Sequence, residues 1–146
     1  MLSRHSKVTS YRDLTVWQQA MDLVDVIYEL TKSFPRDERF GLTAQLHRCA
    51  VSIPSNIAEG HGREHLGEYV HHLSISNGSL MELETQMLIA SRRHYVAARE
   101  VERVLGLSRV VGRLLAGLVR ALTARIPRHH TPGTRHRFER AKLGPQ

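Results

Sequence analysis

The chain has 146 residues, of which 41% are apolar, and it carries a net charge of +7. This length suits one domain with a real core, and no apolar run approaches the ~20 residues that a membrane span needs. The first residues lack the apolar stretch of a signal peptide. Cys49 is the single cysteine, which excludes an intramolecular disulfide and a cysteine-based metal site. We therefore expect a cytoplasmic protein without a membrane segment, in which Cys49 is a buried structural thiol.

The first predicted element is a helix from about Leu14 to Phe34, ended by Pro35. Its apolar residues repeat every three or four positions, as one face of a helix requires. That face comprises Trp17, Ala20, Met21, Val24, Ile27, Tyr28, Thr31 and Phe34. We expect all eight side chains to face the core.

The second element begins near Gly41 and contains SIPSNIAEGHGR, which holds a proline and two glycines. Its apolar residues nevertheless keep one helical phase on both sides of Pro54. They are Leu42, Leu46, Cys49, Ala50, Ile53, Ile57 and Gly60. Two separate helices would have no reason to share a phase, so we predict one helix, kinked at Pro54 and ended by Gly60 and Gly62.

A polar seam runs beside these apolar residues and consists of Gln45, Arg48, Ser52, Asn56, Glu59 and Arg63. The rest of the helix surface carries small residues instead of the lysines and glutamates of an ordinary solvent-exposed face. We therefore interpret this helix as covered by another subunit. Structural or assembly roles are assigned to Arg48, Pro54, Asn56, Glu59, Arg63 and Glu84. The alternative is a ligand-binding or catalytic role for the same stretch.

The third predicted helix extends from about Glu64 to His94, with Gly78 near its middle, where a small residue permits close approach of another backbone. Its apolar stripe comprises Leu66, Tyr69, Val70, Leu73, Leu80, Leu83, Met87 and Leu88. Glu84 falls inside this stripe, and burying a lone carboxylate is costly. We therefore predict an ion pair between Glu84 and Arg48 or Arg63.

The fourth predicted helix, from about Arg99 to Arg125, has a broad apolar face opposite an arginine face. The arginine face consists of Arg99, Arg103, Arg109, Arg113 and Arg120. Only Glu102 shares its arc, so the face is expected to attract phosphate. The alternative is a solvated face that uses arginine without a ligand.

Residues after position 124 contribute +5 of the net charge of +7 and include three prolines. We expect this tail to be disordered or partly ordered. Its candidate phosphate contacts are Arg125, Arg128, Arg135, Arg137 and Arg140. A solubilising extension is the alternative. The predicted organisation is a flexible segment over residues 1–12, a helical bundle over 13–125 and a basic tail over 126–146.

Four helices with short connections predict an all-α fold, an antiparallel up-down four-helix bundle. Such bundles can hold di-metal carboxylate sites, which need Glu-x-x-His motifs from two helices. The chain has one such motif, Glu68 to His71, and its other candidate ligands are Glu59, Glu82 and Glu84. A di-metal enzyme is therefore a remote alternative, and we expect no cofactor, no metal and no enzymatic activity.

Several motifs resemble one known family over about Tyr11 to Leu122. They are Asp13-Leu14 with Trp17, Phe34-Pro35, Glu38-Arg39, Gly41-Leu42, Gln45-Leu46 with Arg48, the stretch Ser52 to Gly60, Gly78-Ser79-Leu80 and Glu82-Leu83-Glu84-Thr85. They resemble the four-helix-bundle proteins called 23S ribosomal RNA intervening-sequence proteins. The resemblance implies a pentameric ring of antiparallel bundles. It also implies kinship with the accessory proteins of diversity-generating retroelements, which are basic, bind nucleic acid and pair with a reverse transcriptase.

These observations together favour a non-enzymatic, basic homo-oligomer that binds nucleic acid, with structured RNA as the expected ligand. Phosphate contacts carry little sequence information, and aromatic residues make up 5% of the chain, which argues against a base-stacking platform. The alternative is a protein-interaction scaffold or accessory subunit for a partner such as a reverse transcriptase. In that case the arginine face would contact an acidic protein surface.

Overall fold

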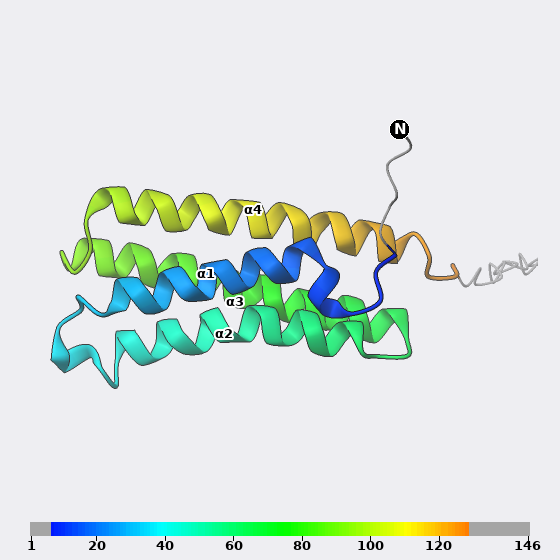
Figure 1. Ribbon diagram of the computed structural model, residues 1–146, viewed down its shortest axis with the longest axis horizontal. Helices are drawn as coiled ribbons and strands as arrows, with labels where there is room; N and C mark the ends of the chain where they lie inside the picture. The colour runs from blue at the N-terminus through cyan, green and yellow to red at the C-terminus, as the bar shows by residue number, and fades with distance from the viewer. Residues whose placement is uncertain (1–6, 129–146) are drawn as a thin grey trace, which may run out of the picture.

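The computed structural model describes residues 7–128, which form a bundle of four long α-helices (Figure 1). The helices are α1 (Thr15–Thr31), α2 (Leu42–His61), α3 (Leu66–Arg92) and α4 (Ala98–Thr123). Two short 3-10 helices, η1 (Tyr11–Asp13) and η2 (Arg36–Glu38), flank α1, and the described range contains no strand. The predicted all-α fold with four helices is confirmed. Residues 1–6 and 129–146, and with them part of the predicted N-terminal segment and most of the basic tail, lie outside the described residues.

Each helix packs against two neighbours, so the bundle has two diagonal pairs. Both α1 and α3 contact α2 and α4, whereas α1 does not contact α3 and α2 does not contact α4. Short connections reverse the chain between successive helices, as Figure 1 shows. In this diagonal arrangement an outward surface on α2 and an outward surface on α4 point away from each other.

The chain enters α1 through a tightly hydrogen-bonded turn at η1. The backbone N–H groups of Thr9 and Ser10 each donate to Asp13 Oδ2 at 3.0 Å, and the Thr9 hydroxyl does the same. The Ser10 side chain accepts from the backbone N–H of Arg12, so that Ser10 and Asp13 form a capping box. The hydrogen bonds from Thr9 and Ser10 lower the pKa of Asp13, because they stabilise its ionised form.

The helix α2 is continuous through Pro54, which confirms the prediction of one helix; the kink at Pro54 stays a prediction. Proline has no N–H, so the Ala50 carbonyl loses its usual helical donor. Carbonyl groups next to this position accept hydrogen bonds from side chains in addition to those of the helix backbone. Ser76 Oγ on α3 donates to the Ile53 carbonyl at 2.9 Å, and Asn56 Nδ2 donates to the Ser52 carbonyl at 2.9 Å.

The core-facing side of α1 is rotated relative to the predicted one. Leu23 is fully buried although it was absent from the predicted face, whereas Met21 and Tyr28 are 38% and 45% exposed. Tyr28 instead stacks on His47 of α2, with the two ring centroids 3.9 Å apart. Tyr11 lies edge-on to Trp17 at 5.4 Å. The aromatic side chains of α1 therefore lie over the boundary between α1 and α2, and smaller aliphatic residues fill the centre of the bundle.

The predicted ion pair between Glu84 and an arginine of α2 is wrong. Glu84 faces α4, where the buried Ser108 donates its hydroxyl proton to Glu84 Oε1 at 2.5 Å. Arg63 instead pairs with Glu59 on its own helix, with Nη2 and Oε1 2.6 Å apart. The physical reason is the helix order: α2 lies on the other side of α3 from α4, so Glu84 points away from the polar seam.

Candidate nucleic-acid interface

The five arginines of the predicted arginine face are all exposed. They lie on the side of α4 opposite its buried residues, which include Val104, Val111 and Leu115. This arrangement follows from the sequence, because the apolar residues and the arginines keep separate helical phases over 26 residues of α4. The arginine face is therefore free to contact a ligand along the length of the helix.

The arginine face has two halves that differ in whether a carboxylate of α4 lies close to the arginines. Glu100 lies within 4 Å of both N-terminal arginines, at 3.9 Å from Arg99 and 3.6 Å from Arg103. Sequence reasoning had named Glu102 as the carboxylate of this arc, but Glu102 forms no ion pair with a described residue. The N-terminal half is thus partly neutralised by Glu100.

The C-terminal half carries Arg109, Arg113 and Arg120, none of which forms an ion pair with a described residue. Their positions span about 16 Å of helix at 1.5 Å per residue. Gly106 and Gly117 lie beside them. A Cβ placed on either glycine would be 3.9 or 3.8 Å from an arginine guanidinium nitrogen. Positive charge therefore lies close to the α4 backbone here, and no ion pair with a described residue offsets it.

Two further candidate arginines, Arg125 and Arg128, are exposed just beyond the end of α4. They extend the unneutralised half of the arginine face towards the tail. The remaining tail candidates, Arg135, Arg137 and Arg140, lie outside the described residues.

The polar seam of α2 is matched by a polar strip on α3. Asn56 Oδ1 and His72 Nδ1 are 3.1 Å apart, and the other ring nitrogen of His72 lies 3.9 Å from Glu59 Oε1. Ser79 Oγ donates to Ser52 Oγ at 2.9 Å. Most of the seam is thus paired inside one chain. Sequence reasoning missed the α3 members, although His72, Ser79, Glu82 and Gln86 follow one another at helical spacing of seven, three and four.

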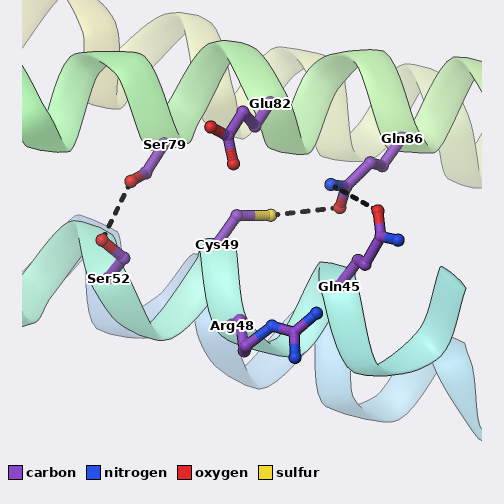
Figure 2. Close-up of a pocket in the computed structure, with 7 residues that line it drawn as sticks. All are labelled: Gln45, Arg48, Cys49, Ser52, Ser79, Glu82 and Gln86. Atoms are coloured by element: carbon purple, nitrogen blue, oxygen red, sulfur yellow. Dashed lines mark hydrogen bonds between the residues drawn. The ribbon is translucent and has the colours of Figure 1, made fainter. Parts of the chain in front are cut away.

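One part of this seam opens into a cavity of about 340 Å³ between α2 and α3, shown in Figure 2. Its lining residues are Gln45, Arg48, Cys49, Ser52, Ser79, Glu82 and Gln86. Cys49 Sγ donates to Gln86 Oε1 at 3.3 Å. Burial, with a smaller contribution from the negative charge of Glu82, raises the pKa of Cys49 to about 11. The thiol is therefore neutral at physiological pH, as expected for a structural cysteine.

The residues of the di-metal alternative do not converge. Glu68 and His71 are exposed, Glu82 lines the cavity between α2 and α3, and Glu84 faces α4. Over residues 7–128, no group of three or more His, Cys, Asp or Glu side chains is placed to hold a metal ion. Within the same range no helix has both the length and the apolar character to cross a bilayer.

The sequence model of the 23S rRNA-intervening sequence protein family matches residues 12–117, which is most of the chain. The chain belongs to this family. The matched range begins within η1 and ends within α4, so it includes the whole α2–α3 polar seam and most of the arginine face. The family resemblance inferred from the motifs of α1, α2 and α3 is thus confirmed.

A solved structure supports the fold of this family member. It is a protein of unknown function from the S23 ribosomal protein family of Bacteroides thetaiotaomicron, with a TM-score of 0.68 and 20% sequence identity. The alignment covers 73% of this chain and 99% of that chain. A search of curated proteins found no match.

Proposed function

We propose that this protein is a non-enzymatic, basic homo-oligomer that binds nucleic acid, with structured RNA as its ligand. The supporting observation is the C-terminal half of the arginine face, where Arg109, Arg113 and Arg120 are exposed and free of ion pairs within the described range. Guanidinium groups suit phosphate because they donate bidentate hydrogen bonds and keep their charge. The name of the family to which the chain belongs mentions 23S rRNA, and RNA is the nucleic acid that we propose.

The chemistry of the face favours backbone contacts over base readout. No aromatic residue lies between Arg99 and Arg128, so α4 offers no platform on which unpaired bases could stack. A row of arginines on a straight helix matches a row of phosphates, and such contacts fix position without reading sequence. In a homo-oligomer such as the pentameric ring that the resemblance implies, each added subunit repeats this face. We therefore propose binding of low sequence specificity that is strongly dependent on salt.

The test is a salt series of RNA binding with full-length variants. The triple variant R109A/R113A/R120A removes the unpaired arginines, and R135A/R137A/R140A removes the tail candidates. The control R36A/R39A/R93A removes the same charge from exposed positions outside α4. The slope of log affinity against log salt is about 0.9 per duplex phosphate contact. We expect the first variant to lower this slope by roughly 2 to 3, with the control close to wild type.

Two results would contradict the proposal. If the α4 variant and the control lower affinity equally, net charge and not the arginine face governs binding. If the wild-type protein binds no RNA at low salt, the scaffold alternative takes precedence, in which the same arginines contact an acidic surface of a protein such as a reverse transcriptase. RNA and DNA duplexes of several sequences belong in the same series, because equal competition among sequences is expected of phosphate contacts.

A further inference from the structure

The outward sides of α2 and α3 carry two complementary strips beside the cavity of Figure 2. The outer strip of α2 comprises Ala44, Arg48, Val51 and Ser55, and that of α3 comprises Ile75, Gly78, Glu82 and Ile89. Their spacings of four, three and four, and of three, four and seven, keep each strip on one helix face. The α2 strip is built mainly of small residues. The α3 strip presents two large ones, because Ile75 and Ile89 are 38% and 44% exposed.

Each strip carries one charge, and the two charges have opposite signs. Arg48 and Glu82 line the same cavity from opposite helices (Figure 2). Neither side chain forms an ion pair with a described residue, and in particular they do not pair with each other. The rest of the polar seam is hydrogen-bonded within the chain. The unpaired charges of Arg48 and Glu82 are therefore available to another molecule.

Gly78 gives an independent indication that a second backbone approaches this face. A glycine inside a helix weakens it, so its presence normally has a packing reason. Among residues 7–128 no such packing reason is present, because a Cβ placed on Gly78 would meet nothing within 4 Å. Gly60, in contrast, is enclosed by Tyr69 and His72. The space above Gly78 lies one helical turn from Glu82, on the same side of α3.

We propose that a second copy of this chain docks on this surface, with the α2 strip of one copy against the α3 strip of the other. Arg48 then pairs with Glu82 of the second copy, and Ile75 and Ile89 lie against Ala44, Val51 and Ser55. Pairing like strips would bring Arg48 against Arg48 or Glu82 against Glu82, which like-charge repulsion opposes. The contact rests on the homo-oligomer of the proposed function. The arginine face belongs to α4, which lies diagonally opposite α2 and borders α3.

Charge reversal tests the contact on the full-length protein. R48E and E82R each place two like charges in the interface, whereas the double variant R48E/E82R restores an opposite pair with its signs exchanged. We expect each single variant to raise the dissociation constant of the oligomer by at least about tenfold, and the double variant to recover most of that loss. Sedimentation velocity across a concentration series measures the effect. R36E and E64R are the matched controls, because Arg36 and Glu64 are exposed and form no ion pair with a described residue.

Gly78→Leu provides a second, independent readout. The added side chain enters open space in the single chain, so circular dichroism should show an intact fold, while the approach of a second copy is blocked. The inference is overturned if wild-type protein sediments as a monomer throughout, or if the charge reversals and Gly78→Leu leave the oligomer unchanged. Salt-dependent RNA binding by R109A/R113A/R120A is measured separately. Loss of assembly in R48E with salt-dependent binding retained would support this contact, whereas an unaffected oligomer that binds RNA would overturn the contact alone.

Discussion

The hydroxyl of Ser76 on α3 donates to the carbonyl oxygen of Ile53 on α2 at 2.9 Å, and Ser76 is fully buried. The bond reaches the α2 backbone at the residue immediately before Pro54. A proline inside a helix costs about 3 kcal/mol, mainly through a lost hydrogen bond and a steric clash. A buried hydroxyl on the neighbouring helix supplies a donor to the same turn, which ties the proline-containing part of α2 to α3.

Removing this donor should destabilise the bundle. We expect Ser76→Ala to lower the free energy of unfolding by about 1 kcal/mol, the usual contribution of one buried hydrogen bond. Thr85→Ala is the control, because Thr85 is exposed and its hydroxyl donates only to its own helix, at the Met81 carbonyl. Urea unfolding followed by circular dichroism measures both. Equal losses of unfolding free energy in the two variants would show that the α2–α3 hydrogen bond stabilises the protein no more than a hydrogen bond within one helix.

The turn between α2 and α3 depends on the absence of a side chain at Gly60. A Cβ there would lie 2.8 Å from His72 Cβ, 2.8 Å from Tyr69 Cδ2 and 3.2 Å from the Tyr69 carbonyl oxygen. Such overpacking typically costs about 1 to 3 kcal/mol, so Gly60→Ala should lower the melting temperature. Gly67→Ala provides the contrast, because nothing lies within 4 Å and alanine favours a helix by up to about 1 kcal/mol. A Gly60→Ala protein as stable as wild type would contradict the close packing of α2 on α3.

The bond between Ser108 and Glu84 should show energetic coupling in a double-mutant cycle. Ser108 is fully buried and Glu84 is partly buried, so the hydrogen bond to a charged acceptor is expected to contribute about 1.5 kcal/mol. The variants are S108A, E84A and the double variant, compared by urea unfolding. Lys32 and Glu29 form the control cycle: their ion pair is 2.8 Å long but both side chains are more than 70% exposed. That cycle should give less than about 0.5 kcal/mol, and equal coupling in the two cycles would contradict the expected effect of burial.

The sequence predicted the four helices closely, because each contains a long apolar stripe with helical period, and Pro35 and the glycines at positions 60 and 62 mark where the first two helices end. It was less informative about rotation of a helix around its own axis. On α1, large apolar side chains occupy more than half of the circumference, so periodicity alone could not distinguish Leu23, which is buried, from Met21, which is exposed. In the structure Tyr28 stacks on His47 and Trp17 lies edge-on to Tyr11, and periodicity alone does not indicate these contacts.

The sequence was also a poor guide to which side chains pair between helices. The polar seam of α2 could be recognised from its spacing, but the choice of partner for Glu84 depends on which neighbours lie on either side of α3. That order is a property of the assembled bundle. Similarly, Arg99 and Arg103 share Glu100 because arginine side chains are long enough to reach a carboxylate outside their own arc. The angular positions of residues around the helix axis therefore identified the arginine face but not its division into two halves.

Cys49 should be nearly unreactive in the folded protein. Its pKa is raised from 9.0 to about 11, which lowers the thiolate fraction near neutral pH about a hundredfold. We expect labelling by iodoacetamide at about pH 8 to be at least about a hundredfold slower in native than in urea-unfolded protein. Because the folded state favours the neutral thiol, this contribution to stability is lost as the pH rises from 9.0 towards 11. Comparable labelling rates for native and unfolded protein would contradict the burial of this thiol.

His47 should make the packing of α1 against α2 sensitive to acid. Thr31 Oγ1 lies 2.9 Å from the Ile27 carbonyl, to which it donates, and 2.8 Å from His47 Nε2. The hydroxyl has one proton. When that proton is donated to a backbone carbonyl, the contact with His47 requires the tautomer that donates from Nε2, and Nδ1 is then the site of further protonation. Burial lowers the pKa of His47 below 6.5, since the charged ring is poorly solvated between the helices.

The unfolded state therefore binds the proton more readily than the folded state. The stabilising contribution of neutral His47 is present above pH 6.5 and is lost as the pH falls through the lowered folded value. We expect His47→Gln to reduce the melting temperature at about pH 7.5 and the gap to wild type to narrow at about pH 5. His71→Gln, at an exposed position on α3, is the control and should change the melting temperature little. A His47→Gln gap that stays constant over the same range would show that protonation of this ring does not affect the stability of the bundle.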